Sequence, residues 1–220
     1  MIAPAGQRAS RLSVLARLQL GLEALYRVET RLPIDAFLVD AETRDATLGT
    51  GARLPREQLV VRQSGGELAM ALFVDQAALA NLERHDPSAR LDERNFTDFC
   101  LAVEGVSHFI YLALCAAGDR AVSQLELELQ AEVDKYACCV LLAGRDPELR
   151  RRLYRDVQFA DDLDPDERSR YQAANAEADR YAAALERRFI QTDRTEAMLA
   201  ELRRFYRMAL ADKLGRIARL

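Results

Sequence analysis

The first third of the chain changes its hydrophobic spacing several times. Between residues 8 and 28 the apolar side chains recur every three or four positions with Arg and Glu between them, which predicts an amphipathic helix. Pro33 ends this pattern, and the apolar run 34–39 predicts a strand. The stretch that follows, up to Pro55, is rich in Gly, Thr and Arg and is expected to be a loop.

Two apolar runs follow, at 58–62 and 67–74, with Gly65 and Gly66 between them. A pair of glycines between two strand-like runs is typical of a β-hairpin, because both turn residues can then adopt a positive φ. Residues 76–84 predict a short helix after the hairpin.

From Phe96 onward every predicted element is a helix. Ser123 and Glu126 have the spacing of a capping box, and Asp164 followed by Pro165 is a second helix start. The predicted helices end at Ala117, at Gly144, at residue 190 and at residue 219, and another begins near Pro147. The sequence therefore predicts an α+β protein that is mostly helical, with a small antiparallel or mixed β-sheet.

Composition narrows the classes of function. Half of the 220 residues are hydrophobic and the net charge is −4, so nucleic-acid binding through bulk positive charge is disfavoured. No run of 18 apolar residues is free of charge, and residues 1–7 lack the basic character of a signal peptide. The four Cys have no CxxC spacing and lie in apolar stretches, where Cys is usually a small buried side chain. We expect a cytoplasmic protein without a membrane segment.

One apolar helix carries the most informative polar pair. Glu104 and His108 are four positions apart, and they share one helix face because an α-helix advances about 100° per residue. On the next helix Glu128, Glu132 and Lys135 also share a face. The connection is short, so the two helices should pack antiparallel, and Glu104, His108 and Glu132 could then converge. Burial would require these charges to be paired or bound to a metal.

These two helices resemble the active-site helices of the zincin metallopeptidases, in particular the ImmA/IrrE-like branch. Those enzymes carry a hairpin, a helix reading roughly F-T-L-A-H-E-L-G-H-Y and a second helix reading roughly E-A-D-R-F-A-A-x-L-L. The corresponding residues here are Phe96-Thr97, then Ala102-Val103-Glu104-Gly105-Val106-Ser107-His108-Phe109, and Glu132-Val133-Asp134-Lys135-Tyr136-Ala137-Cys138-Cys139-Val140-Leu141-Leu142. The likeness covers residues 55–145, hairpin included. It implies a zincin-like α+β domain, which we expect over residues 1–160. The apolar stripes of the last two predicted helices suit a helical hairpin over 161–220 that packs on this domain or mediates association.

The departures from the family's motif are informative. The resemblance places His108 on the second zinc-binding His and Glu132 on the third ligand, while Glu104 replaces the first His and can still bind a metal. Gly105 stands where the family has the Glu that deprotonates the metal-bound water. Peptidase chemistry is therefore not expected unless another carboxylate, such as Glu128, replaces that base. Glycine inside a helix costs about 1 kcal/mol relative to Ala, so residue 105 indicates either a close approach or room for a ligand.

Two interpretations of the cluster are open. With a metal bound, Glu104, His108 and Glu132 would form a harder ligand set than two imidazoles, which makes Mn²⁺ and Fe²⁺ candidates beside Zn²⁺. Without a metal, the same side chains would form a hydrogen-bonded ionic cluster. We expect a catalytically degenerate metallopeptidase-like protein that acts as a binding or regulatory module. The alternatives are a metal-dependent hydrolase with a relocated base, and a helical scaffold that binds a protein partner or itself through residues 165–219.

Overall fold

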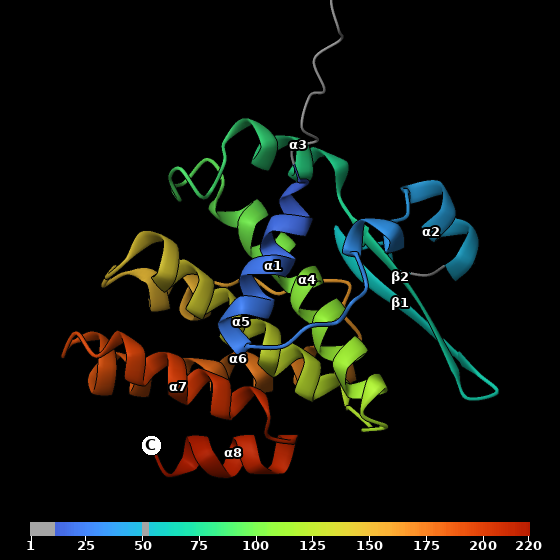
Figure 1. Ribbon diagram of the computed structural model, residues 1–220. Coiled ribbons are helices and arrows are strands. Elements are labelled where there is room, and N and C mark those ends of the chain that lie inside the picture. The colour runs from blue at the N-terminus through green and yellow to red at the C-terminus, as the bar shows by residue number, and fades with distance from the viewer. Residues whose placement is uncertain (1–11, 50–52) are drawn as a thin grey trace, which may run out of the picture.

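The computed structural model describes residues 12–49 and 53–220 of the chain. The fold is α+β and mostly helical, with one two-stranded antiparallel sheet, as the sequence predicts (Figure 1). The predicted helix over 8–28 spans Val14–Tyr26, and residues 8–11 lie outside the described part of the chain. The elements in chain order are α1 (Val14–Tyr26), η1 (Ile34–Phe37), α2 (Ala41–Leu48), β1 (Glu57–Ser64), β2 (Glu67–Val74), α3 (Gln76–Arg84), α4 (Phe96–Ala117), α5 (Gln124–Ala143), η2 (Arg151–Arg155), α6 (Pro165–Leu185), η3 (Glu186–Ile190), α7 (Thr195–Tyr206) and α8 (Leu210–Ala218).

Helix α4 lies at the centre of the molecule. It contacts α1, α3, α5 and both strands, and α6 packs along α5 (Figure 1). Phe99, Val106 and Phe109 on α4 are fully buried, and they belong to one hydrophobic core that extends from α1 to α8. This helix is long and apolar enough to cross a membrane by length and composition, but 72% of its most apolar window is buried inside the protein. Burial of that kind is typical of the core helix of a folded domain.

The hairpin has the register that its glycine pair predicts. Glu57 pairs with Val74 at the base, and Ser64 pairs with Glu67 next to the turn. Gly65 and Gly66 have φ values of 57° and 86°, a backbone conformation that favours glycine at both turn positions. The base of the hairpin is packed against α4, whereas its tip projects away from the helices (Figure 1).

The strand predicted over 34–39 is wrong. Ile34–Phe37 form a 3₁₀ turn, and only Leu38 makes a parallel bridge, to Leu72 of β2. The cause is a side chain from α1, because Oε1 of Gln19 accepts the backbone N–H of Ile34 at 2.9 Å and so takes a donor that a sheet would use.

The loop predicted up to Pro55 is also wrong in part, because it contains α2. Asp40 caps this helix by accepting the N–H of Thr43 at 2.8 Å. Arg44 holds the helix in place, since its guanidinium lies 3.9 Å from the centre of the Phe73 ring and donates to the carbonyl of Pro55 at 3.0 Å. The segment has no apolar stripe, which is why hydrophobic spacing did not predict it.

The last predicted helix, 195–219, is two helices. α7 ends at Tyr206 and α8 begins at Leu210, because Ala209 is extended with ψ at 165°. The predicted starts at Ser123 and Asp164 are confirmed, and Asp164 forms a full capping box with Glu167. The helix predicted after Pro147 is only a short helical segment that ends in the π-turn η2. The division into a domain over 1–160 and a hairpin over 161–220 stays a prediction.

Candidate metal centre

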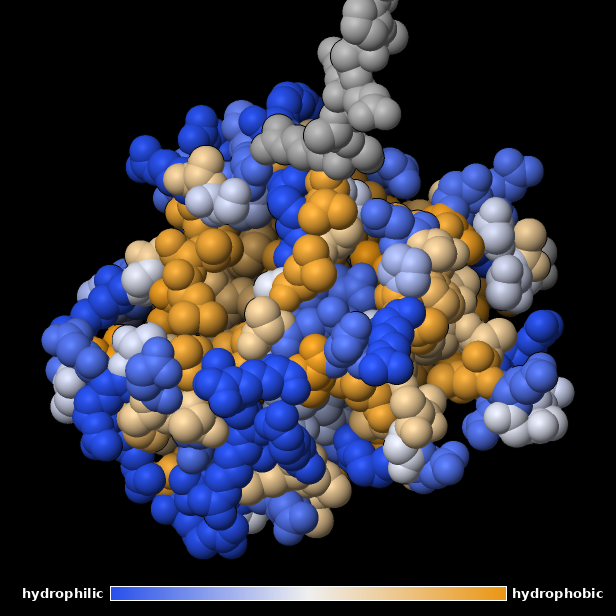
Figure 2. Space-filling view, viewed as in Figure 1, coloured by the Kyte–Doolittle hydropathy of each residue, from blue (hydrophilic) through white to orange (hydrophobic). Residues whose placement is uncertain are grey.

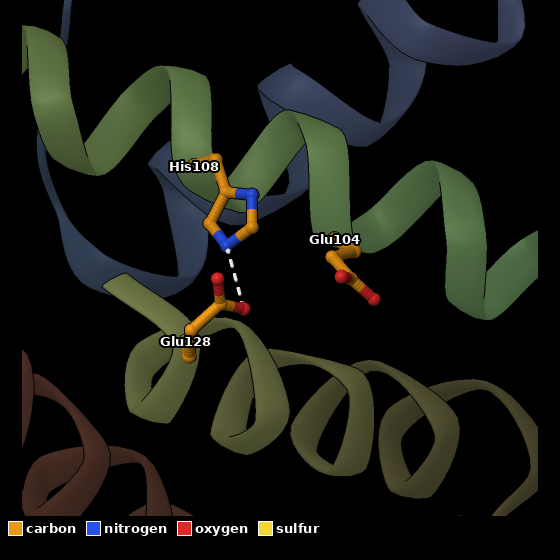
Figure 3. Close-up of side chains that lie close together, drawn as sticks. All are labelled: Glu104, His108 and Glu128. Atoms are coloured by element: carbon orange, nitrogen blue, oxygen red, sulfur yellow. Dashed lines mark ion pairs between the residues drawn. The ribbon is translucent and has the colours of Figure 1, made fainter. Parts of the chain in front are cut away.

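Glu104 and His108 lie one turn apart on α4 and face α5 (Figure 3). One ligand atom each of Glu104, His108 and Glu128 lie within 4.8 Å of one another. Because they could hold one metal ion, we call these three residues the metal-binding group. Nε2 of His108 lies 3.5 Å from Oε2 of Glu128, and the side chains of these two residues are only 11% and 12% exposed. A buried group of two carboxylates and one imidazole could hold a metal ion.

The geometry of the His108 imidazole is compatible with a bound ion. Its Nε2 is buried and has no hydrogen-bond partner among the described residues. The 3.5 Å to Glu128 is long for a hydrogen bond. Two ligand atoms that are each about 2.1 Å from one ion in a tetrahedral site are about 3.4 Å apart, which matches this spacing.

Glu132 lies one turn further along α5 and is held differently. Its Oε1 accepts from Nζ of Lys135 at 2.7 Å, and the same ammonium donates to Oε2 of Glu104 at 3.0 Å. The second oxygen of Glu132 is buried without a partner among the described residues. The structure thus brings Glu128, rather than Glu132, into the group with Glu104 and His108. The role of Glu132 as a ligand stays a prediction, as does that of Glu128 as a base.

A fourth carboxylate reaches the same place from the hairpin. Glu57 is the first residue of β1, its side chain is 7% exposed, and its Oε1 lies 3.7 Å from Nδ1 of His108. A Cβ atom added to Gly105 would lie 3.0 Å from both Cγ and Oε1 of Glu57. Glycine at this helical position is therefore explained by the close approach of a side chain. Sequence spacing gave no sign of Glu57, because it lies 51 positions before His108 on a different element.

Burial and mutual charge set the protonation of this region. Burial would lower the pKa of His108, but Glu128 and Glu57 outweigh it and the pKa is raised well above its usual value. Burial would likewise lower the pKa of Lys135, but the carboxylates of Glu104 and Glu132 raise it. Burial raises the pKa of Glu57, and the imidazole of His108 offsets only part of that effect.

The two partners of Lys135 respond in opposite directions. Burial raises the pKa of Glu132, and Lys135 offsets only part of that effect. For Glu104, burial also acts upward, yet Lys135 and His108 together bring its pKa below the usual value. Four buried or half-buried carboxylates thus surround one ammonium and one imidazole, an excess of negative charge that a divalent cation would neutralise.

The other polar residues on the same helix faces lie elsewhere. Tyr111 is turned away from His108 and its hydroxyl donates to Oε1 of Glu126 at 2.7 Å. The cysteines are free thiols, and burial raises the pKa of Cys138 and of Cys115. Raised thiol pKa values leave little thiolate, which is the form that binds metals and reacts.

A second buried polar cluster joins α8 to the centre of the fold. Nζ of Lys213 donates to the hydroxyl of Tyr111 at 2.8 Å and to Oε1 of Gln130 at 2.6 Å. We call Lys213, Tyr111, Gln130 and Glu126 the lysine network. Lys213 is 0% exposed, and burial lowers its pKa to about 7 in spite of nearby carboxylates. One sequence signal could have found it, because the chain has only two Lys beside its many Arg, and both are held in buried clusters.

Asp134 extends this cluster toward α1 and α4. Its carboxylate accepts from Ser107 at 2.6 Å, from Gln130 at 2.7 Å and from the hydroxyl of Tyr26. Burial raises its pKa to about 6, although these donors act in the opposite direction. Asp134 therefore holds together α1, α4 and α5 rather than contributing to the metal-binding group.

An apolar groove of 220 Å³ lies between α1 and the end of α5. Figure 2 shows apolar side chains along α1 and beside it, and Leu141 and Leu142, which line the groove, are each about half exposed. The described large apolar side chains that are exposed all lie outside residues 165–219. Association through 165–219 stays a prediction, and that segment offers no exposed large apolar side chain to support it.

Comparison of the chain with protein-family models, with curated proteins and with solved structures finds no match. The metal-binding group and its surroundings are thus the features from which a function can be argued.

Proposed function

We propose that the protein binds one divalent metal ion through Glu104, His108 and Glu128, and that it acts as a binding or regulatory module rather than as a peptidase. The observation that carries this proposal is the buried Nε2 of His108, which lacks a hydrogen-bond partner within the described residues and lies 3.5 Å from Oε2 of Glu128, with Glu104 in the same group. A buried imidazole nitrogen and an excess of carboxylates are costly without a cation to satisfy them.

The proposal includes descent from a metallopeptidase of the zincin type, to which α4 and α5 bear their resemblance. Gly105 supplies no carboxylate to deprotonate a metal-bound water. The side chains of the metal-binding group are between 11% and 25% exposed, so the centre is nearly closed. A closed centre without a base on α4 suits an ion that stabilises the packing of the helices, or one whose binding regulates the protein.

The donor set indicates which ions to test. Two carboxylates and one imidazole suit Mn²⁺ and Fe²⁺ as well as Zn²⁺, since oxygen ligands favour harder cations. No thiol belongs to the group, so ions that require sulfur are not expected.

Calorimetric titration of the metal-stripped protein with Zn²⁺, Mn²⁺ and, without oxygen, Fe²⁺ tests the proposal. We expect one site per chain. Glu128→Gln should lower the affinity by more than about a hundredfold, because removing a ligand costs more than removing an outer partner.

Glu132→Gln is the matched control, one turn away on the same helix. It should leave the affinity within about threefold of the wild type, since the lone ammonium of Lys135 already holds Glu132. Loss of binding in Glu132→Gln with retention in Glu128→Gln would instead assign the site to Glu104, His108 and Glu132. A wild-type protein that binds none of the three ions, and whose melting temperature they do not raise, would refute the proposal.

A further inference from the structure

Glu57 is an unusual residue for the base of a hairpin. It begins β1, it points inward, and its Oε1 is buried with no hydrogen-bond partner among the described residues. A carboxylate in this position is costly unless a partner accounts for it. The group that faces Oε1 is Nδ1 of His108, at 3.7 Å.

The fold makes room for this carboxylate at the expense of α4. A Cβ on Gly105 would lie 3.0 Å from Cγ and Oε1 of Glu57 and 3.2 Å from Cδ1 of Leu72. Contacts of 3.0 Å are tighter than nearly all packed Cβ contacts, so a side chain at position 105 would require Glu57 to shift by a few tenths of an ångström. Helix α4 carries a glycine at the point where Glu57 approaches it, although glycine inside a helix costs about 1 kcal/mol of stability relative to Ala.

The two nitrogens of His108 face different partners. Nε2 faces Glu128 of the metal-binding group, and Nδ1 faces Glu57. An imidazole that binds an ion through Nε2 must carry its proton on Nδ1, and an acceptor on that side fixes both the tautomer and the ring orientation.

We propose that Glu57 is the positioning residue of the metal centre. Its carboxylate, carried by β1 into the space above Gly105, lies 3.7 Å from Nδ1 of His108, an ion-pair distance beyond hydrogen-bond range. When an ion is bound at Nε2, this carboxylate accepts a hydrogen bond from Nδ1–H and so directs Nε2 toward Glu104 and Glu128. The inference rests on the proposed function. Position 105 of α4 has no carboxylate, and the hairpin places that of Glu57 beside it. In this proposal Glu57 orients the imidazole and does not act as a general base.

Affinity measurements on two variants of Glu57 test the acceptor. Glu57→Met keeps a side chain of similar length but removes the acceptor, and it should lower the metal affinity by about 10- to 100-fold. Glu57→Gln keeps an acceptor oxygen and should recover most of that loss. If Glu57 had a purely structural role, the metal affinity of Glu57→Met would not be lower than that of Glu57→Gln.

The contact with Gly105 gives a second, independent test. Gly105→Ala should lower the affinity in the wild type, because the new Cβ displaces Glu57, but should have no further effect when combined with Glu57→Met. Gly21→Ala is the matched control, since Gly21 also lies inside a helix and nothing is within 4 Å of its added Cβ.

Nitrogen-15 NMR of the Zn²⁺-loaded protein reports the tautomer directly. The chain has two His, so in the variant His85→Gln the remaining imidazole signals all belong to His108. We expect a proton on Nδ1 that exchanges slowly in the wild type and at least tenfold faster in Glu57→Met, with Nε2 bound to the ion.

The outcomes separate the inference from the proposed function. If the wild type binds an ion and Glu57→Met binds it equally well with the same tautomer and proton exchange, the inference is wrong and the metal centre stands. If the wild type binds no ion, both are wrong. If Glu57→Met is unfolded by circular dichroism, the comparison of Gly105→Ala with the wild type decides, and an unchanged affinity in Gly105→Ala overturns the inference.

Discussion

The buried amine of Lys213 makes the stability of this protein depend on pH in a defined direction. Its pKa is about 7 in the native state, against 10.5 for a free lysine. Between these two pH values the unfolded chain binds a proton that the native state does not bind. Raising the pH therefore favours the native state, by about 1.4 kcal/mol per pH unit. Because the native amine is still half protonated at pH 7, the free energy of unfolding should rise by about 2.3 kcal/mol from pH 7 to pH 9 through this residue alone.

Urea unfolding of the wild type and of Lys213→Met at pH 7, 8 and 9 isolates this contribution. Methionine has a similar length and no titrating group, so the variant should lack the rise. Thiols and tyrosines also titrate in the unfolded chain, but they do so in both proteins and cancel in the difference. The sign of the overall stability change at a single pH is not the test, because Lys213→Met also removes the bonds to Tyr111 and Gln130.

NMR of the lysine side chains gives a direct check. With only two Lys in the chain, each Nζ and Cε signal can be assigned with one variant. The signal of Lys213 should titrate near pH 7, and that of Lys135 should not titrate below pH 10. Equal slopes of unfolding free energy in the two proteins, together with a Lys213 signal that titrates above pH 10, would refute the reasoning. The ammonium would then be charged in the native state and paired with carboxylates.

Three further predictions are tested by urea unfolding at pH 7. Asp164→Ala removes the capping box of α6 and should cost about 1 kcal/mol; a change below about 0.3 kcal/mol would contradict the role of the cap. Phe205→Ala empties a fully buried site stacked on Tyr181 and should cost about 3–5 kcal/mol, and a loss below about 1.5 kcal/mol would show that the core collapses around it. Gly21→Ala should stabilise the protein by up to about 1 kcal/mol, whereas Gly144→Ala, at a φ of 73°, should destabilise it by about 1 kcal/mol; changes of the same sign in both would refute this reading of the backbone.

The elements with local causes could be predicted from the sequence. The glycine pair at 65–66 and the caps at Ser123 and Asp164 each act over a few residues, so their signals are contained in short segments. The elements that depend on distant partners could not. The 3₁₀ turn at Ile34 needs the side chain of Gln19, and α2 has no apolar periodicity.

The residues of the candidate site divide in the same way, into those that local spacing predicts and those that depend on contacts between distant segments. Spacing on α4 gave Glu104 and His108, because both belong to one helix. Glu128 and Glu132 share one face of α5, so the choice between them depends on how far α5 is shifted along α4, which spacing along a helix does not fix. Glu57 depends on how the hairpin packs against α4, a contact between segments far apart in the chain.

The geometry of the hairpin also constrains which changes the tip can accept. Side chains alternate between the two faces of a strand, so shifting the pairing of β1 by one residue would turn Glu57 from His108 to the opposite side. The tight turn at Gly65–Gly66 keeps Ser64 opposite Glu67 and, seven residues earlier, Glu57 opposite Val74. A single-residue insertion or deletion at this solvent-facing loop, remote from every ionisable group of the centre, could thus dismantle the centre while the helices keep their places.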